Sequence, residues 1–482
     1  LNAFPTVGHS GVLTSYITAL KWHQHAGELI QEGYDKFGGR PFKVATMSKW
    51  IVVFSGTKYV EHIRTAPINV LSFRAEIAER FQNRYTMGRV ISNDFYHIEV
   101  IRSTLTRNLG SRFSDIRDEI LASFQDFIPL TEDWTVVPAY ETSMHIVCRV
   151  ANRFFVGLPL CRNPGYLSLI ESYTRDVAVS AKTINSFPEF LKPLVGRYLT
   201  PLPRTVQRAL GYLGPMVEER LMQEELHGKE WDERPATECL QFLQNDLLTW
   251  LLGQATQEHH YTVHDLTIRI LTVNFAANHN TSMSLTHALY DLAVHPEHIK
   301  ELREEIEAVV EEDGWTKPAL FRMRKVDSFL KESQRLSSAS TLRVNRIALQ
   351  DFTFSDGTFI PAGATIGVAV DAMNKEEDLF PEAHTFKGFR FAEMREGSGE
   401  LDGIRHQMVS LGLDQIVFGQ GRHACPGRFF AVSELKAIFA HILLNYDMQL
   451  ENGSRERPPH KCLEILMLPD PRAKLMFRKR RD

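Results

Sequence analysis

The amino-acid sequence predicts a mainly α-helical protein with small β-sheets. From residue 57 to about residue 349 the apolar pattern is mainly helical. Short β-rich runs lie on either side of that region. One stretch inside it, Thr262 to His295, is long enough for a helix of about 50 Å. Hydrophobic residues make up 43% of the 482 residues, which is ordinary for a globular protein with a large core.

The N-terminal elements follow from local patterns. Residues 10–37 predict a helix that ends at Gly38 and Gly39, and residues 42–47 and 50–55 predict a hairpin. Prolines then break the helical region into separate helices. They stand at positions 188, 193, 201 and 203.

The long helix has clear boundary signals. Thr262 followed by Asp265 resembles a capping box, and Pro296 marks the end. The helix is apolar on several sides, which predicts burial in the core. A polar cluster in its middle, residues 278–282, is unexpected in such a helix.

Further elements are expected towards the C-terminus. Residues 298–312 and 326–337 predict helices, and residues 351–370 predict a small sheet around two turns. Residues 463–477, interrupted at 469–471, predict another hairpin.

Charge and cysteine content exclude several classes. The formal net charge of −4 gives no strong field for nucleic acid. The five cysteines include no C-x-x-C pair, which argues against a structural zinc site or a disulfide framework. No run of 18 apolar residues predicts a membrane span, and the start at Leu1 instead of Met suggests that an upstream segment was removed.

The most informative stretch is FGQGRHACPG, Phe418 to Gly427, which places three glycines around Cys425 just before a helical run. Glycines permit tight turns and close approach to a flat ligand. A thiolate at this place would be stabilised by the helix N-terminus and free N–H groups. The alternative, a buried cysteine that only fills space, is our interpretation of the other four cysteines.

This loop resembles the cysteine signature of the cytochrome P-450 family, F-x-x-G-x-[H/R]-x-C-x-G. The resemblance implies that Cys425 is the thiolate ligand of a haem b iron, that Phe418 and Gly419 lie beside the haem, and that His423 contacts a propionate. It extends over nearly the whole chain. It therefore implies the cytochrome P-450 fold, with a long central helix over the haem, in a single catalytic domain of residues 1–482.

Two further segments match the family in the expected order. Glu332 and Arg335 fit its E-x-x-R motif, and Arg390 fits its aromatic-Arg segment, which implies a buried ion network of the three residues. Glu and Arg three apart otherwise form an ordinary surface pair. Arg346 stands where the family often places a propionate-binding arginine.

The match near residue 100 is incomplete. The family usually has W-x-x-x-R there, whereas this chain has Tyr96, His97 and Arg102. His97 and Arg102 are expected to reach the haem, and the alternative for Arg102 is an exposed helix position.

The polar cluster of the long helix resembles the oxygen-side motif A-G-x-[D/E]-T-[T/S]. It implies that Thr281 relays protons with ordered water, aided by Asn280, and that Ala276 and Ala277 leave room beside the haem. The motif's glycine and acid are replaced by Asn278 and Asn280. The neighbouring His279 could supply a proton if it faces the site, or could pack on another helix face.

Substrate contacts are implied by the resemblance alone. They include Phe73, Phe275, Ala276, Leu342 and Ile465, each of which could also be ordinary core. They suggest an apolar pocket for a terpenoid, steroid or fatty acid. The segments HACPGRFFA and TLTRN look like fungal enzymes related to ent-kaurene oxidase.

The function implied is a monooxygenase that uses O₂ and electrons from an NADPH–cytochrome P-450 reductase, because no dinucleotide-binding segment is visible. Family members of this kind sit on the cytosolic face of the endoplasmic reticulum through an N-terminal membrane anchor. The alternatives are a haem-thiolate isomerase, dehydratase or peroxide-dependent enzyme, and a non-catalytic haem or ligand-binding protein. A basic docking face is expected from five arginines, at positions 102, 107, 112, 422 and 428.

Overall fold

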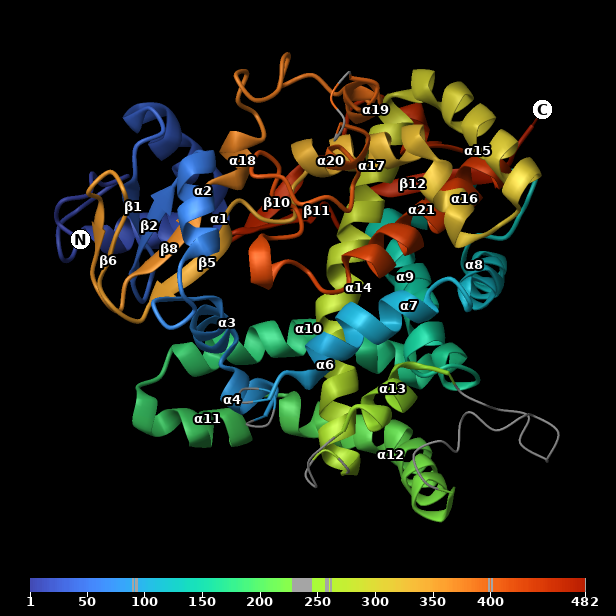
Figure 1. Cartoon of the computed structure of the whole chain (residues 1–482), viewed down its shortest axis with the longest axis horizontal. Coiled ribbons are helices and arrows are strands. Elements are labelled where there is room, and N and C mark those ends of the chain that lie inside the picture. Colours follow the sequence, from blue (N-terminus) through green and yellow to red (C-terminus); the bar gives the residue numbers. More distant parts are fainter. Residues whose placement is uncertain are drawn as a thin grey trace.

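A computed structural model describes residues 1–88, 91, 94–227, 245–255, 260, 262–397, 399 and 402–481. Within them the protein is mainly helical with small sheets, as predicted (Figure 1). Cys239 lies outside the described residues.

The helices follow one another along most of the chain. They are α1 (Ser15–Phe37), α2 (Thr57–Thr65), α3 (Phe73–Phe81), α4 (Asn83–Thr86), α6 (Tyr96–Val100), α7 (Thr106–Asn108), α8 (Phe113–Phe127), α9 (Ala139–Phe155), α10 (Pro164–Asn185), α11 (Lys192–Tyr198), α12 (Leu202–His227), α13 (Leu247–Gly253), α14 (Val263–Val294), α15 (Ile299–Asp313), α16 (Lys317–Arg322), α17 (Arg324–Leu336), α18 (Val370–Met373), α19 (Arg390–Arg395), α20 (Asp402–Arg405) and α21 (Arg428–Asn445). A π-helical segment, η1 (Ile101–Leu105), joins α6 to α7.

The helix α14 is the predicted long helix, and its boundaries agree with the sequence signals. The Thr262 side chain accepts a hydrogen bond from the Asp265 N–H, as an N-cap should. Residues of α9, α10, α12 and α21 pack around α14 in the largest core cluster, which explains why it is apolar on several sides. Figure 1 shows α14 passing through the middle of the helical part.

The prolines separate the helices of this region, as predicted, and two of them also lie at helix starts. The helix α10 ends at Asn185, and α11 and α12 follow as separate helices. Pro193 and Pro203 lie in the first turn of these helices, where the missing N–H costs nothing.

Four small sheets accompany the helices in the described part of the chain. The strands are β1 (Phe42–Ala45), β2 (Trp50–Phe54), β3 (Leu71–Ser72), β4 (Thr135–Pro138), β5 (Arg343–Ala348), β6 (Phe352–Thr353), β7 (Phe359–Ile360), β8 (Thr365–Val368), β9 (Tyr446–Leu450), β10 (His460–Leu463), β11 (Leu466–Pro469) and β12 (Lys474–Lys479). The largest sheet has the order β1-β2-β8-β5-β3 and lies to one side of the helices (Figure 1).

The predicted hairpin at residues 42–55 is confirmed, because β1 and β2 pair antiparallel. The predicted hairpin at residues 463–477 is wrong. The strand β11 pairs with β10, whereas β12 pairs with β4 and β9, which are distant in sequence. The two prolines at 469 and 471 separate β11 from β12, so the local pattern could not reveal the true partners.

Candidate active site

The loop before α21 presents Cys425. The Cys425 N–H donates to the Phe418 carbonyl oxygen at 2.7 Å, which closes the loop. Gly427 is the residue before the first turn of α21, so the sulfur lies next to that helix N-terminus.

Two glycines are required by this turn. Gly419 and Gly421 have φ values of +69° and +59°, in the left-handed region that favours glycine. A Cβ at Gly419 would lie 3.1 Å from the His423 carbonyl oxygen, and one at Gly421 would lie 2.8 Å from Arg64 Cγ. The sequence pattern around Cys425 therefore has a local steric cause.

The surroundings of Cys425 are electropositive. Burial raises the pKa of its thiol, and the Gly427 N–H and the guanidinium groups of Arg428 and Arg343 oppose this rise. Arg428 also donates to the Cys425 carbonyl oxygen at 3.2 Å. Such an environment suits a sulfur that carries negative charge towards a metal.

These residues fit a haem. In the described part of the chain, no group of three or more His, Cys, Asp and Glu residues could hold a metal ion. A single thiolate at Cys425 matches haem, which would need only this ligand from the loop. The buried Arg346 suits a haem propionate group.

Arg346 and His423 form a basic cluster with an aromatic ring between them. The Phe73 ring centroid lies 5.4 Å from that of His423 and 5.5 Å from the Arg346 guanidinium carbon. Burial lowers the pKa of Arg346 to about 10, so it stays charged at neutral pH. Burial and the charges of Arg346 and Arg74 lower the pKa of His423 to about 4, so its imidazole is neutral. Phe73 packs against these two residues, and its place in the substrate pocket stays a prediction.

His97 lies against the central helix. Its Nδ1 is 3.0 Å from a guanidinium nitrogen of Arg269 on α14. Because arginine can only donate, Nδ1 accepts and the neutral ring carries its proton on Nε2. Burial and the Arg269 charge lower the pKa of His97 to about 4, which keeps the ring neutral. Nε2–H is therefore an available donor.

Arg102 does not join this group. Its side chain is 46% exposed and pairs with Glu99 at 3.1 Å. The expectation that Arg102 reaches the haem is not supported, since one turn of η1 directs it to the surface. The alternative of an exposed helix arginine describes its position.

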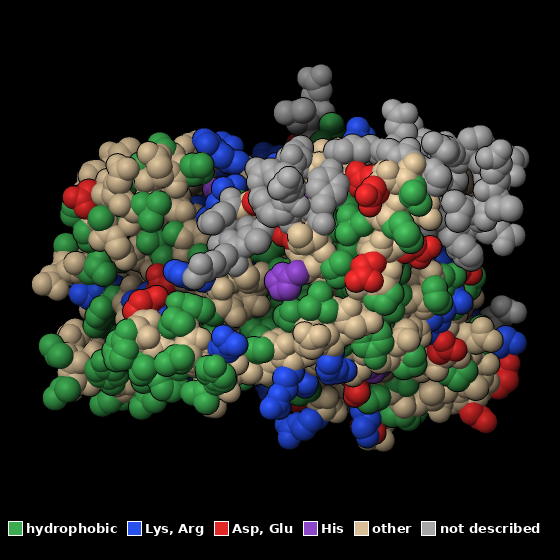
Figure 2. Space-filling view, turned by 90° about the horizontal axis from the view of Figure 1, so that it is seen from below, with side chains coloured by type: hydrophobic (Ala, Val, Ile, Leu, Met, Phe, Trp, Pro, Cys, Tyr) green, Lys and Arg blue, Asp and Glu red, His purple; other side chains and the backbone are tan. Residues whose placement is uncertain are grey.

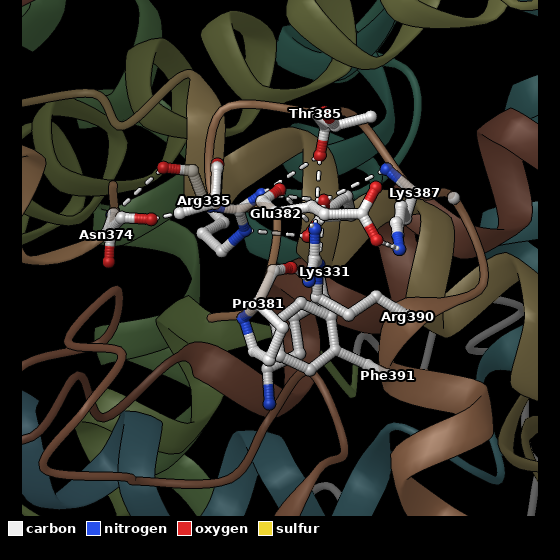
Figure 3. A network of polar contacts seen from close by, with 12 residues as sticks. Lys331, Arg335, Asn374, Pro381, Glu382, Thr385, Lys387, Arg390 and Phe391 are labelled. Atoms are coloured by element: carbon white, nitrogen blue, oxygen red, sulfur yellow. Dashed lines mark hydrogen bonds and ion pairs between the residues drawn. The ribbon is translucent and has the colours of Figure 1, made fainter. Parts of the chain in front are cut away.

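The E-x-x-R residues form a fully buried network (Figure 3). Glu332 pairs with Arg335 at 2.8 Å and with Arg390 at 3.1 Å. The two guanidinium groups also donate to five carbonyl oxygens, those of Asn374, Pro381, Glu382, Ala383 and Thr385. This network ties α17 to the segment before α19.

The polar cluster of α14 divides between two faces. The Thr281 hydroxyl donates to the Ala277 carbonyl oxygen at 2.9 Å, and the Asn280 amide donates to that of Ala276 at 3.1 Å. Asn280 and Ala276 are exposed, on a helix that is otherwise mostly buried. His279 points elsewhere, with Nδ1 at 3.0 Å from the Tyr140 hydroxyl.

The remaining pocket residues fall into two sets. Phe275 makes an edge-to-face contact with Phe81 of α3, at a centroid distance of 5.1 Å. Leu342 and Ile465 belong to a buried cluster with α1 and β1, and their place in the pocket stays a prediction.

The sequence analysis missed three charged residues around the site: Glu76, Arg269 and Arg343. Glu76 is buried and holds Arg80 at 2.7 Å. The only sequence signal for Arg343 was its place three residues before Arg346, which in a regular strand predicts opposite faces.

Comparisons with known proteins agree with these features. The cytochrome P-450 family profile matches residues 10–477. Cytochrome P-450 monooxygenases 151 and 103 of Postia placenta are each 41% identical to this chain, over its full length and 94% of their own. Cytochrome P-450 monooxygenase paxQ of Penicillium paxilli is 32% identical over 99% of this chain and 92% of its own length. The chain belongs to the cytochrome P-450 family and is a haem-containing monooxygenase.

Proposed function

We propose that this enzyme oxidises a hydrophobic small molecule of the terpenoid or steroid kind, with Cys425 as the iron ligand. The observation that carries the proposal is the Cys425 loop beside α21, where the partly buried thiol has basic residues around it. When bound, haem activates O₂ for insertion of one oxygen atom into a C–H bond, and thiolate ligation favours cleavage of the O–O bond.

The protein would hold the haem through residues on several elements. Phe418 and Gly419 would lie against its proximal face. Arg346 and the neutral His423 would bind propionate oxygens, and His97 would donate from Nε2–H. Arg269 acts through His97 by fixing its tautomer, and is a positioning residue.

Thr281 is the proposed proton carrier on the oxygen side. Its hydroxyl hydrogen is engaged by the Ala277 carbonyl, which leaves the Oγ1 lone pairs to accept from water. Asn280 can orient that water through Oδ1, but it does not titrate. His279 is a poor proton donor to the site, because burial lowers its pKa and its ring contacts Tyr140 and Glu171.

The substrate proposal rests on apolar side chains near α14 and on the sequence similarity of two segments. Phe275 and Phe81 offer an aromatic edge beside the small Ala276, which suits a bulky hydrocarbon. The segments HACPGRFFA and TLTRN, similar to fungal ent-kaurene oxidase relatives, support a terpenoid.

A flavoprotein reductase is the proposed electron donor. Arg102, Arg107 and Arg422 are exposed, which supports a basic docking face for an acidic partner. Arg112 is not part of it, because its side chain is 13% exposed and pairs with Asp115.

We place the protein on the cytosolic face of the endoplasmic reticulum. None of the described helices is long and apolar enough to cross a membrane. Apolar side chains are nevertheless exposed at one end. They include Val12, Leu13, Ile17 and Leu20 near α1, and Phe190, Leu194, Tyr198 and Leu199 around α11. Figure 2 shows hydrophobic side chains gathered at the left of the face seen from below, where α11 lies in Figure 1. These side chains would insert into the lipid surface.

The whole chain is proposed to act as one catalytic domain.

The test begins with the iron ligand. The reduced, carbon-monoxide-treated protein should show the red-shifted Soret band of thiolate ligation, and Cys425→Ala should abolish it. Cys462→Ala is the matched control, because Cys462 is a second partly buried free thiol and should leave the band unchanged. A band that survives Cys425→Ala would refute the assignment.

Turnover then separates monooxygenase chemistry from the isomerase, dehydratase and peroxide-dependent alternatives, which Asn280 in place of an acid leaves open. A terpenoid and steroid panel with reductase, NADPH and isotopically labelled O₂ should yield products that carry one labelled oxygen, detected by mass spectrometry. Unlabelled products, or turnover without NADPH, would favour an alternative.

A further inference from the structure

A β-bulge in β5 turns two arginines towards the same side. Arg343 lies opposite Val368 of β8, and Arg346 lies opposite Ile366. Three steps along β5 therefore match two along β8, which is the signature of one extra residue. Directly opposed side chains share a face, and residues two apart on β8 share a face as well. Arg343 and Arg346 consequently point the same way.

The bulge requires a strained backbone conformation. Val344, between the arginines, has a φ of +55° and is 7% exposed. A β-branched residue in this region is strained, and such strain persists at binding sites where surrounding structure enforces it. The strained backbone is what aims Arg343.

Arg343 faces the iron-ligand side of the site without a counter-charge. Its Nε is buried and has no hydrogen-bond partner among the described residues. Its charge interacts with the Cys425 thiol and the Arg80 guanidinium. The Glu76 carboxylate, which acts on the charge of Arg346, pairs with Arg80. Arg343 as a whole is half-buried, and an enclosed guanidinium N–H without an acceptor is costly unless a ligand supplies one.

Resting on the proposed function, we propose that Arg343 binds a carboxylate in the active site, and that the preferred substrates are hydrophobic acids. Arginine matches a carboxylate with two parallel hydrogen bonds. A haem propionate offers the same chemistry. The substrate is favoured because Arg346 and His423, which flank the Phe73 ring, already supply the propionate contacts in the proposed function.

The test compares acids with their neutral esters on the intact holoenzyme. Lauric acid, retinoic acid and lithocholic acid, each with its methyl ester, serve as probes in equilibrium dialysis. Wild type should bind at least one acid about tenfold or more tightly than its ester. Arg343→Gln should bring that ratio to about one, and Arg343→Lys should keep part of it, because only charge is retained. Arg455→Gln removes an exposed arginine in the same way and should leave the ratio within about twofold of wild type.

A second readout identifies the source of the carboxylate. The rate of haem transfer to apomyoglobin should be unchanged in Arg343→Gln if the substrate supplies it. Faster transfer with an unchanged acid-to-ester ratio would assign Arg343 to a propionate and overturn the substrate proposal. No preference for any acid in wild type, with unchanged haem transfer in the variant, would overturn carboxylate binding altogether. The thiolate band of each protein is recorded in parallel, so failure of the haem assignment is recognised separately.

Discussion

Two pairs of arginines, Arg335 with Arg390 and Arg343 with Arg346, differ in how far the chain neutralises their charge. Arg335 and Arg390 share the Glu332 carboxylate and donate to five carbonyl oxygens. Within the described residues, Arg343 and Arg346 together have one acceptor, the Asn345 carbonyl oxygen. A buried charge that the chain itself satisfies is scaffold, whereas one left short of acceptors marks where ligand charge arrives.

The largest loss of stability is expected around Arg335 and Arg390, whose charges the chain itself neutralises. Glu332→Gln leaves Arg335 and Arg390 buried against a neutral amide and should lower the free energy of unfolding by about 3–5 kcal/mol. Urea unfolding followed by circular dichroism measures it. Glu301→Gln breaks an exposed pair with Lys325 and should cost less than about 1 kcal/mol. Equal losses in both variants would remove the distinction drawn above.

Another buried arginine, Arg269, extends the comparison to pH. Burial and the Arg269 charge lower the pKa of His97 from 6.5 to about 4. Between these values the unfolded chain binds the proton and the folded one does not, so stability is complete above pH 6.5 and is lost as pH falls towards 4. His97→Gln should remove up to about 1.4 kcal/mol per pH unit of that slope. The exposed His25→Gln serves as control in unfolding curves across this window. An unchanged slope in His97→Gln would mean that the ring is not held neutral.

A variant of Arg346 tests whether the second pair of arginines binds ligand charge. Arg346→Gln should release haem to apomyoglobin about tenfold faster, a loss of about 1.4 kcal/mol in haem binding. Arg74→Gln, an exposed neighbour of the same cluster, should have a smaller effect. Similar rates in both variants would argue that Arg346 meets no propionate.

The smallest effect concerns the bulge. At position 344 glycine accepts the φ of +55° without strain, whereas alanine does not. Val344→Gly should therefore be more stable than Val344→Ala by about 1 kcal/mol, the reverse of the usual order in strands. Thermal unfolding of the two variants decides it, and the usual order would show that the backbone relaxes.

The sequence predicted what local chemistry determines. Cys425 stands in a turn set by its own glycines, so that turn could be predicted from local spacing. The buried Glu332–Arg335 pair was implied by the family resemblance, because the same spacing also fits a surface pair. The role of Arg343 could not be predicted, because its direction depends on the register between β5 and β8.

The enclosed Nε of Arg343 also has a thermodynamic consequence. This N–H gains an acceptor when an anion binds, so ligand occupancy should stabilise the whole fold, by an amount that grows with the logarithm of ligand concentration. Melting temperature thus becomes a sensor of what the enzyme accepts, and a screen for heat tolerance should rank acidic lipids above their neutral counterparts before any product is detected.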